Sequence, residues 1–175
     1  LTQAFNAGED VYKKMASRIY VLPEEDINKN QRFVGKTTIL GAGYGMGAVK
    51  FQAQLKTFGF DMELDEARRV ISIYRDTNDK ISSLWAAAQK FLKDSANGDD
   101  TQFGLDGVLK VIDGAILLPS GLKLGYADLQ FTQTDKGVEF DYKTRRGRTR
   151  IYGGKVIENV CQAIARCIIG EQMLQ

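Results

Sequence analysis

Apolar residues recur every three to four positions over most of the chain, which is the spacing of one face of an α-helix. This spacing predicts helical structure over residues 1–22, with an interruption at Gly8. It continues over residues 28–97, with one break at the glycine-rich segment GAGYGMG and another at FGFDMELD. At the second break we expect Asp61 or Asp65 to cap the following helix, because a carboxylate accepts hydrogen bonds from the free amides of a helix start.

The pattern changes over residues 98–150 to short alternating runs, which are typical of β-strands. Three dipeptides are candidates for the turns between these strands: Asp113-Gly114, Ser120-Gly121 and Lys136-Gly137. From about Lys155 the helical spacing returns, and one predicted face contains Val156, Val160, Ile164, Cys167 and Ile168. We therefore expect a mainly helical α+β fold with a small antiparallel sheet, divided into residues 1–27, 28–97, 98–150 and 151–175.

Composition limits the class of protein. The chain has 175 residues and is 43% hydrophobic, which suits one domain or two small lobes that share a core. The net charge of +2 is too small to indicate nucleic-acid binding unless the cations are clustered. The sequence contains no apolar run of about 18 residues and no signal-peptide pattern at its start, so we expect a cytoplasmic protein that does not enter a membrane.

The chain contains no histidine, which excludes Ser-His and Cys-His catalysis and histidine metal sites in the isolated polypeptide. Its two cysteines, Cys161 and Cys167, do not form a CxxC pair, and we interpret them as reduced packing residues. Any chemistry must therefore depend on carboxylates, lysine, tyrosine or a bound metal.

The segment QRFVGKTTILGAGYGMG contains Gly-Lys-Thr, which suggests the end of a phosphate-binding P-loop. A P-loop also needs a glycine at position 30, where this chain has Asn30, and a buried strand upstream, where it has EEDINKNQ. The alternating glycines do not have the GxGxxG spacing either. We therefore do not expect a P-loop here.

The same segment is better interpreted as a helix. Arg32, Lys36, Leu40 and Tyr44 are spaced four apart, so they lie near one face. Two cations followed by an apolar and an aromatic side chain could hold a triphosphate at one end and a base at the other. The alternative is a solvated helix that ends at a glycine, and the spacing leaves both open.

RFVGKTTILGAGYG resembles motif B of the family A DNA polymerases, in which Arg, three residues, Lys and seven residues precede Tyr-Gly. Arg32, Lys36, Tyr44 and Gly45 occupy these places. Upstream, LTQAFNAGEDVYKKMASRIY resembles the helical segment that follows motif A in phage-type members, and GGKVIENVCQAIARCII resembles the helix that precedes motif C. The resemblance covers nearly the whole chain in the right order.

The resemblance implies a fingers-like helical lobe over residues 28–97, flanked by palm helices. It implies that Arg32 and Lys36 contact the triphosphate of the incoming dNTP, and that Lys36 has a catalytic role in protonating the leaving pyrophosphate. Leu40 would lie near the sugar or base, where the family often has an aromatic residue, and Tyr44 with Gly45 near the templating base. Gln162 would reach the minor-groove side of the DNA, and Asn159 would face roughly the same way.

Polymerisation in this family needs two Mg²⁺ ions held by aspartates of motifs A and C. Neither motif is present, so we expect no metal in this chain, Mg²⁺ only in the complete polymerase, and no catalysis by the isolated chain. The acidic clusters Glu63, Asp65, Glu66 and Asp99, Asp100 are interpreted as a helix start and a turn. The missing palm segments are expected partners, and their absence favours self-association.

The segment YKTRRGRTR concentrates cations between Tyr142 and Tyr152, at Lys143, Arg145, Arg146, Arg148 and Arg150. It is typical of either a DNA phosphate contact or a solvated loop, and the resemblance favours contact through Arg145, Arg146 and Arg148. Trp85 and Tyr74 are interpreted as core residues.

Three hypotheses remain open. The chain is part of a DNA-directed DNA polymerase that binds dNTP and primer-template DNA, a stand-alone non-catalytic nucleic-acid-binding prophage remnant, or an unrelated helical binding protein or NTPase.

Overall fold

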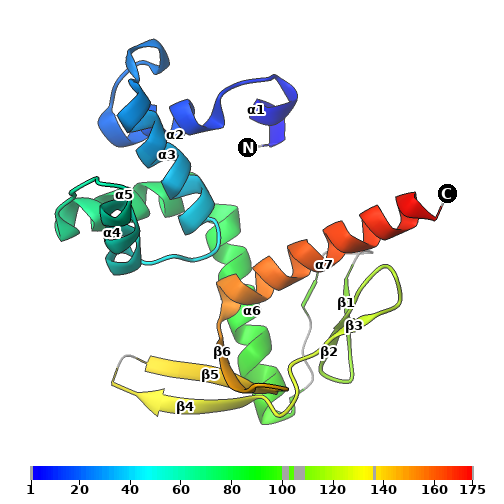
Figure 1. Ribbon diagram of the computed structural model, residues 1–175. Helices are drawn as coiled ribbons and strands as arrows, with labels where there is room; N and C mark the ends of the chain where they lie inside the picture. Colours follow the sequence, from blue (N-terminus) through cyan, green and yellow to red (C-terminus); the bar gives the residue numbers. More distant parts are fainter. Residues whose placement is uncertain (1, 100–102, 105–108, 136, 175) are drawn as a thin grey trace. The chain divides into compact units, whose positions relative to one another are not determined.

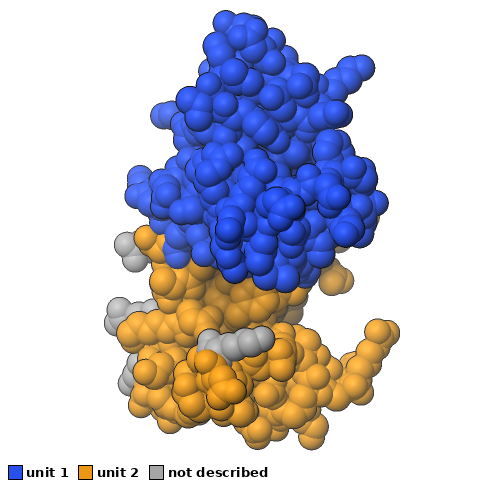
Figure 2. All heavy atoms as spheres, turned by 90° about the vertical axis from the view of Figure 1, so that its left-hand side faces the viewer, with its two compact units in different colours: residues 1–82 blue, residues 83–175 orange. Residues whose placement is uncertain are grey.

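The computed structural model describes residues 2–99, 103–104, 109–135 and 137–174. The chain forms two compact units, Leu1–Ser82 and Ser83–Gln175, which are coloured separately in Figure 2. The regular structure of the first unit is helical, whereas the second combines helices with antiparallel strands (Figure 1). The predicted mainly helical α+β fold is therefore confirmed.

The helices that lie wholly in the first unit are α1 Thr2–Asn6, α2 Val11–Tyr20, the 3-10 turn η1 Glu24–Asp26, α3 Lys29–Ala42, α4 Ala48–Thr57 and α5 Leu64–Thr77. Glycine or proline follows within three residues of the ends of α1 to α4, whereas the C-cap of α5 is Asn78. Helix α3 begins with a capping box, in which Asn28 and Gln31 each accept from the backbone amide of the other. This pair fixes the start of the helix that carries Arg32 and Lys36.

The predicted cap of α5 was wrong. Glu63 is the N-cap residue, and its side chain makes no capping hydrogen bond. Asp61 lies before the helix, and Asp65 lies in its first turn together with Glu66. Asp65 and Glu66 instead stabilise the helix start through the helix dipole and through ion pairs one turn along the helix, with Arg68 at 2.6 Å and Arg69 at 3.7 Å.

Helices α2 and α3 pack closely because α3 has a glycine at the contact. A Cβ atom on Gly35 would lie 2.3 Å from the backbone oxygen of Tyr12 and 3.0 Å from the backbone nitrogen of Ala16. Beside this contact Ala16 and Thr38 are completely buried, and the Thr38 hydroxyl donates to the Val34 carbonyl oxygen at 2.8 Å. The glycine therefore determines how near α3 lies to α2.

The second unit contains two small sheets where the sequence predicted one. Helix α6 Asp79–Asn97 begins in the first unit and continues into the second, whose other elements are β1 Lys110–Ile112, β2 Ala115–Leu117, β3 Lys123–Leu124, β4 Gln130–Thr134, β5 Gly137–Thr144, β6 Gly147–Ile151 and α7 Gly153–Met173 (Figure 1). The strands pair in sequence order as β1-β2-β3 and β4-β5-β6. Strand β3 is only two residues long, and the chain then turns at Asp128, with a φ of 48°, before it starts the second sheet.

Two of the predicted turns, at Asp113-Gly114 and at Ser120-Gly121, lie between strands of the first sheet. Lys136 of the third predicted turn lies outside the described residues, and so does Asp100 of the second acidic cluster. Gly137, the second residue of that predicted turn, begins β5. Both hairpin turns of the first sheet thus contain the glycines that the sequence pattern indicated.

The core of the second unit lies among α6, both sheets and α7. Its fully buried side chains include Ala88, Leu92, Ile116 and Val156. Trp85 packs partly against this core, as expected, and Tyr74 is buried in the first unit.

Helix α7 packs on this core only as far as Cys167. The predicted helical segment is confirmed as α7, and along its predicted face Val156 and Val160 are buried whereas Ile168 is 51% exposed. Burial ends because α7 extends beyond the last residue that touches the core. Both cysteines are free, but Cys161 is exposed and therefore is not the packing residue that we expected.

Candidate nucleotide-binding helix and nucleic-acid interface

Helix α3 brings three of the four predicted nucleotide-binding residues onto one face. Arg32, Lys36 and Leu40 follow one another at successive turns, and Lys36 is exposed, as is half of the Leu40 side chain. The helix ends at Ala42, so Tyr44 does not belong to it and our prediction of a continuous helical face was wrong there. Tyr44 lies in the following turn, 40% exposed, and precedes Gly45, whose φ is 79°.

The helical structure excludes a P-loop at this site. Gly35 and Lys36 lie inside α3, and their backbone amides are committed to the helix. A P-loop needs a glycine-rich turn whose free amides surround phosphates before the helix begins. The side chains of α3 are therefore what the segment offers to a ligand.

Arg32 is held in place by two residues of the segment that starts α2. Its Nε donates to Oδ2 of Asp10 at 2.7 Å, and its guanidinium carbon lies 5.2 Å from the centre of the Tyr12 ring. Within the described part of the chain, no other side chain binds the guanidinium. The two terminal Nη groups therefore remain available as forked donors at a half-buried position.

Asp10 has two structural roles, which our sequence analysis missed. Its Oδ1 accepts from the backbone amides of Tyr12 and Lys13 at 3.1 Å and so caps α2, while Oδ2 accepts from Arg32. Burial alone would raise the pKa of Asp10, but the hydrogen bond from Arg32 and those from the two amides outweigh it and hold the pKa below its usual 3.8. An aspartate directly before VYKKM was a usable N-cap signal, but nothing local indicated the pair with Arg32.

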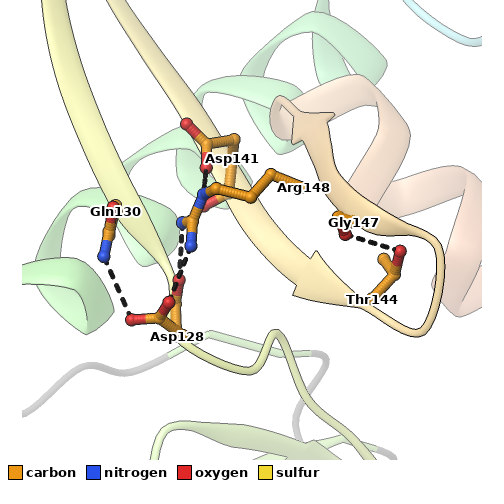
Figure 3. Close-up of polar contacts among 6 residues, drawn as sticks. All are labelled: Asp128, Gln130, Asp141, Thr144, Gly147 and Arg148. Carbon is orange, nitrogen blue, oxygen red and sulfur yellow. Dashed lines mark hydrogen bonds and ion pairs between the residues drawn. The ribbon is translucent and has the colours of Figure 1, made fainter.

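In the second unit, Arg148 is enclosed by acidic groups (Figure 3). Its Nη1 donates to Oδ2 of Asp128 at 2.6 Å, its Nη2 to the Asp128 backbone oxygen at 2.8 Å, and its Nε to Asp141. The hydrogen bond from Arg148 lowers the pKa of Asp128, and the hydrogen bonds that Arg148 donates to Asp141 and Asp128 raise the pKa of Arg148. Arg150 likewise pairs with Glu139 at 2.9 Å. These two cations are already compensated, which sequence spacing did not reveal.

Arg145 and Arg146 lie in the turn between β5 and β6, where both are exposed. Neither makes an ion pair with a described residue. The turn is ordered by Thr144, whose hydroxyl donates to the Gly147 carbonyl oxygen at 2.7 Å (Figure 3). The same hydroxyl accepts from the Arg146 amide at 3.2 Å. The tip of this hairpin therefore presents two uncompensated cations on a fixed backbone.

The two predicted DNA-contacting residues of α7 have different surroundings. Asn159 is half-buried and donates from Nδ2 to the hydroxyl oxygen of Tyr126 at 3.2 Å, whereas Gln162 is exposed. Tyr126 also packs edge-on against Tyr142, with ring centres 5.1 Å apart. Burial raises the pKa of Tyr126 to about 12, although the bond from Asn159 opposes the shift.

The described residues contain no group of three or more His, Cys, Asp or Glu side chains that could hold a metal ion. Mg²⁺ therefore has no matching ligand set in this part of the chain, and its presence in a complete polymerase stays a prediction. Nor does any helix of the described ranges have the length and apolar character to cross a membrane.

Comparison with known proteins identifies the family. The sequence profile described as DNA polymerase family A matches residues 1–110, so the chain belongs to the family A DNA polymerases and the predicted resemblance is confirmed. The match contains α3 with Arg32 and Lys36, whereas strands β2 to β6 and helix α7 lie beyond it.

The chain is also similar to the DNA polymerase of Bacillus phage SP02, with 30% identity over 179 residues. This alignment covers 94% of the present chain but only 27% of the phage protein. The chain thus spans about a quarter of the length of that relative, and the alignment includes the second unit as well as the first.

Proposed function

We propose that this chain provides the fingers of a family A DNA polymerase and binds the triphosphate of an incoming dNTP through Arg32 and Lys36. The arrangement of α3 is the observation that supports this most directly. Arg32 is fixed through Nε with its Nη groups available, and Lys36 follows one turn later, exposed and without an ion pair to a described residue. A forked donor beside a point charge suits the spread-out negative charge of a triphosphate.

Lys36 has a second role in this proposal. As phosphoryl transfer proceeds, negative charge grows on the departing pyrophosphate, and a nearby ammonium group can stabilise it and donate a proton. Leu40, half-exposed one turn further on, and Tyr44 with Gly45 in the following turn would contact the sugar and base. Mg²⁺ would be held by residues of the complete polymerase.

The binding step can be tested with a fluorescent dATP analogue titrated against the full 175-residue chain. Replacing Lys36 by alanine removes a charge-assisted contact of about 1.5–3 kcal/mol, so we expect the Kd to rise about tenfold or more. Lys80, an exposed lysine at the start of α6, is the matched control, and Lys80→Ala should leave the Kd unchanged. Equal affinity of the Lys36 and Lys80 variants would contradict the proposal.

We also propose that the second unit contacts the phosphates of primer-template DNA through Arg145 and Arg146, with Gln162 and Asn159 of α7 near the minor groove. Arg148 contributes less in this proposal, because Asp128 and Asp141 already compensate its charge. The slope of log K against log salt is negative, and each lost phosphate contact makes it less steep by about 0.9 for duplex DNA. Arg146→Ala should therefore flatten the salt dependence, and an unchanged slope would count against the contact.

Contacts with palm segments of a longer polymerase, self-association of this chain and a cytoplasmic location stay predictions.

A further inference from the structure

Three phenylalanine rings form a cluster on the first unit that the proposed nucleotide contacts do not use. Phe33 of α3 stacks on Phe60 with ring centres 5.0 Å apart and planes 13° from parallel, and Phe58 meets Phe33 edge-on at 5.2 Å. We call these three residues the aromatic cluster. Phe58 remains 54% exposed, so the cluster presents a ring to the surroundings.

The backbone holds the exposed ring in place. The amides of Phe58 and Phe60 both donate to the carbonyl oxygen of Leu55, at 3.0 and 3.1 Å, and Leu55 itself is fully buried. Between them Gly59 has a φ of 80°, a backbone conformation that favours glycine. The ring of Phe58 is therefore pre-positioned, which lowers the entropy cost of stacking a ligand on it.

The segments that carry the cluster have charge of only one sign. Between Asp26 and Asp61 the chain has no acidic residue, and its cations there are Lys29, Arg32, Lys36, Lys50 and Lys56. Lys29 lies one helical turn before Phe33, and Lys56 lies two residues before Phe58. Both lysines are exposed, and within the described ranges neither forms an ion pair.

An exposed, pre-positioned ring on segments that also carry exposed lysines matches the chemistry of single-stranded nucleic acid. A single strand offers unstacked base faces together with a phosphate at every nucleotide, and base–aromatic stacking tolerates any sequence. Duplex DNA offers the phosphates but keeps its base faces stacked inside. We propose that the aromatic cluster, with Lys29 and Lys56, is a binding site for single-stranded DNA. This site uses different residues from the dNTP contacts and does not depend on them.

The test places a fluorescent reporter at the exposed ring. Trp85 is the single tryptophan, so Trp85→Phe combined with Phe58→Trp makes position 58 the only indole in the chain. Titration with an oligo(dT) of about 12 nucleotides, within the usual site size, should quench this indole saturably. The matched control is Phe5→Trp in the same Trp85→Phe background, because Phe5 is 63% exposed on α1 and outside the cluster. The emission of the control should not change.

Salt and competition identify the ligand. In the Phe58→Trp background, Lys56→Ala should make the negative slope of log K against log salt less steep by about 0.7, and Lys80→Ala should leave it unchanged. Duplex DNA of the same length should displace the oligonucleotide poorly. Three results would overturn the proposal: no change in emission at position 58, a salt slope insensitive to Lys56, or equally effective competition by duplex. The dNTP titration on Lys36 is independent, so failure of one proposal can be distinguished from failure of the other.

Discussion

A methyl group added to Gly35 would collide with the backbone of α2. The new Cβ would lie 2.3 Å from the Tyr12 oxygen, whereas real Cβ contacts essentially never fall below 3.0 Å. The atoms in the way belong to the backbone, so no side-chain rotation can relieve the overlap. Helices α2 and α3 must move apart by about 0.7 Å, the difference between these two distances.

The magnitude follows from two opposing terms. Overpacking of a close contact costs typically about 1–3 kcal/mol, and a backbone collision belongs at the upper end of that range. Alanine gains about 1 kcal/mol over glycine in a helix interior. We therefore expect Gly35→Ala to lower the free energy of unfolding of the first unit by about 2 kcal/mol. Gly170 in α7 has no atom within 4 Å of its added Cβ, so Gly170→Ala should instead stabilise by about 0.5–1 kcal/mol.

Native-state hydrogen exchange gives the readout, because it reports each unit separately. A loss of 2 kcal/mol corresponds to about 30-fold faster exchange of the slowest amides in α2 and α3. The Gly170 variant should slow the exchange of α7 amides. If Gly35→Ala exchanges as slowly as the unmodified chain, the close approach of α2 to α3 is not what stabilises this unit.

Two further predictions concern titratable groups. Asp10→Ala removes the α2 cap and should lower the free energy of unfolding by about 1 kcal/mol. Asp10→Asn keeps an accepting oxygen and should lower the free energy of unfolding by less, and urea denaturation measures both variants. The pKa of Asp10 is lowered in the folded chain, so the stability that the ionised carboxylate contributes is complete above pH 3.8 and is lost as the pH falls through the folded pKa. Asp10→Asn should therefore weaken the loss of stability at acid pH. The pKa of Tyr126 is raised, so its stabilisation is complete below pH 10 and is lost as the pH rises towards about 12. Tyr126→Phe should reduce the loss of stability at alkaline pH, measured by thermal unfolding followed by circular dichroism. If the variant loses as much stability at alkaline pH as the unmodified chain, Tyr126 is not the group responsible.

Much of the secondary structure was predictable because it depends on near neighbours. Helical periodicity, glycine breaks and proline placed the helices of residues 2–97, and alternating runs with glycine turns placed the strands. The same local logic put Arg32 and Lys36 on one face, because residues four apart in a helix always share it. Motif B then indicated the family, which the profile match confirmed.

The state of each charged side chain was decided by the tertiary structure. Arg32 and Asp10 are 22 residues apart, and they meet because Gly35 allows α3 to lie close to α2. Arg146 and Arg148 belong to the same cation-rich segment and could not be told apart by sequence, yet the sheet places Arg148 between two aspartates and leaves Arg146 at the hairpin tip. The sequence by itself therefore determined the family, the helices and the positions of the cations along them. Only packing decided which cations are compensated and which remain able to bind phosphate, because ion pairing depends on distances between elements that no local pattern encodes.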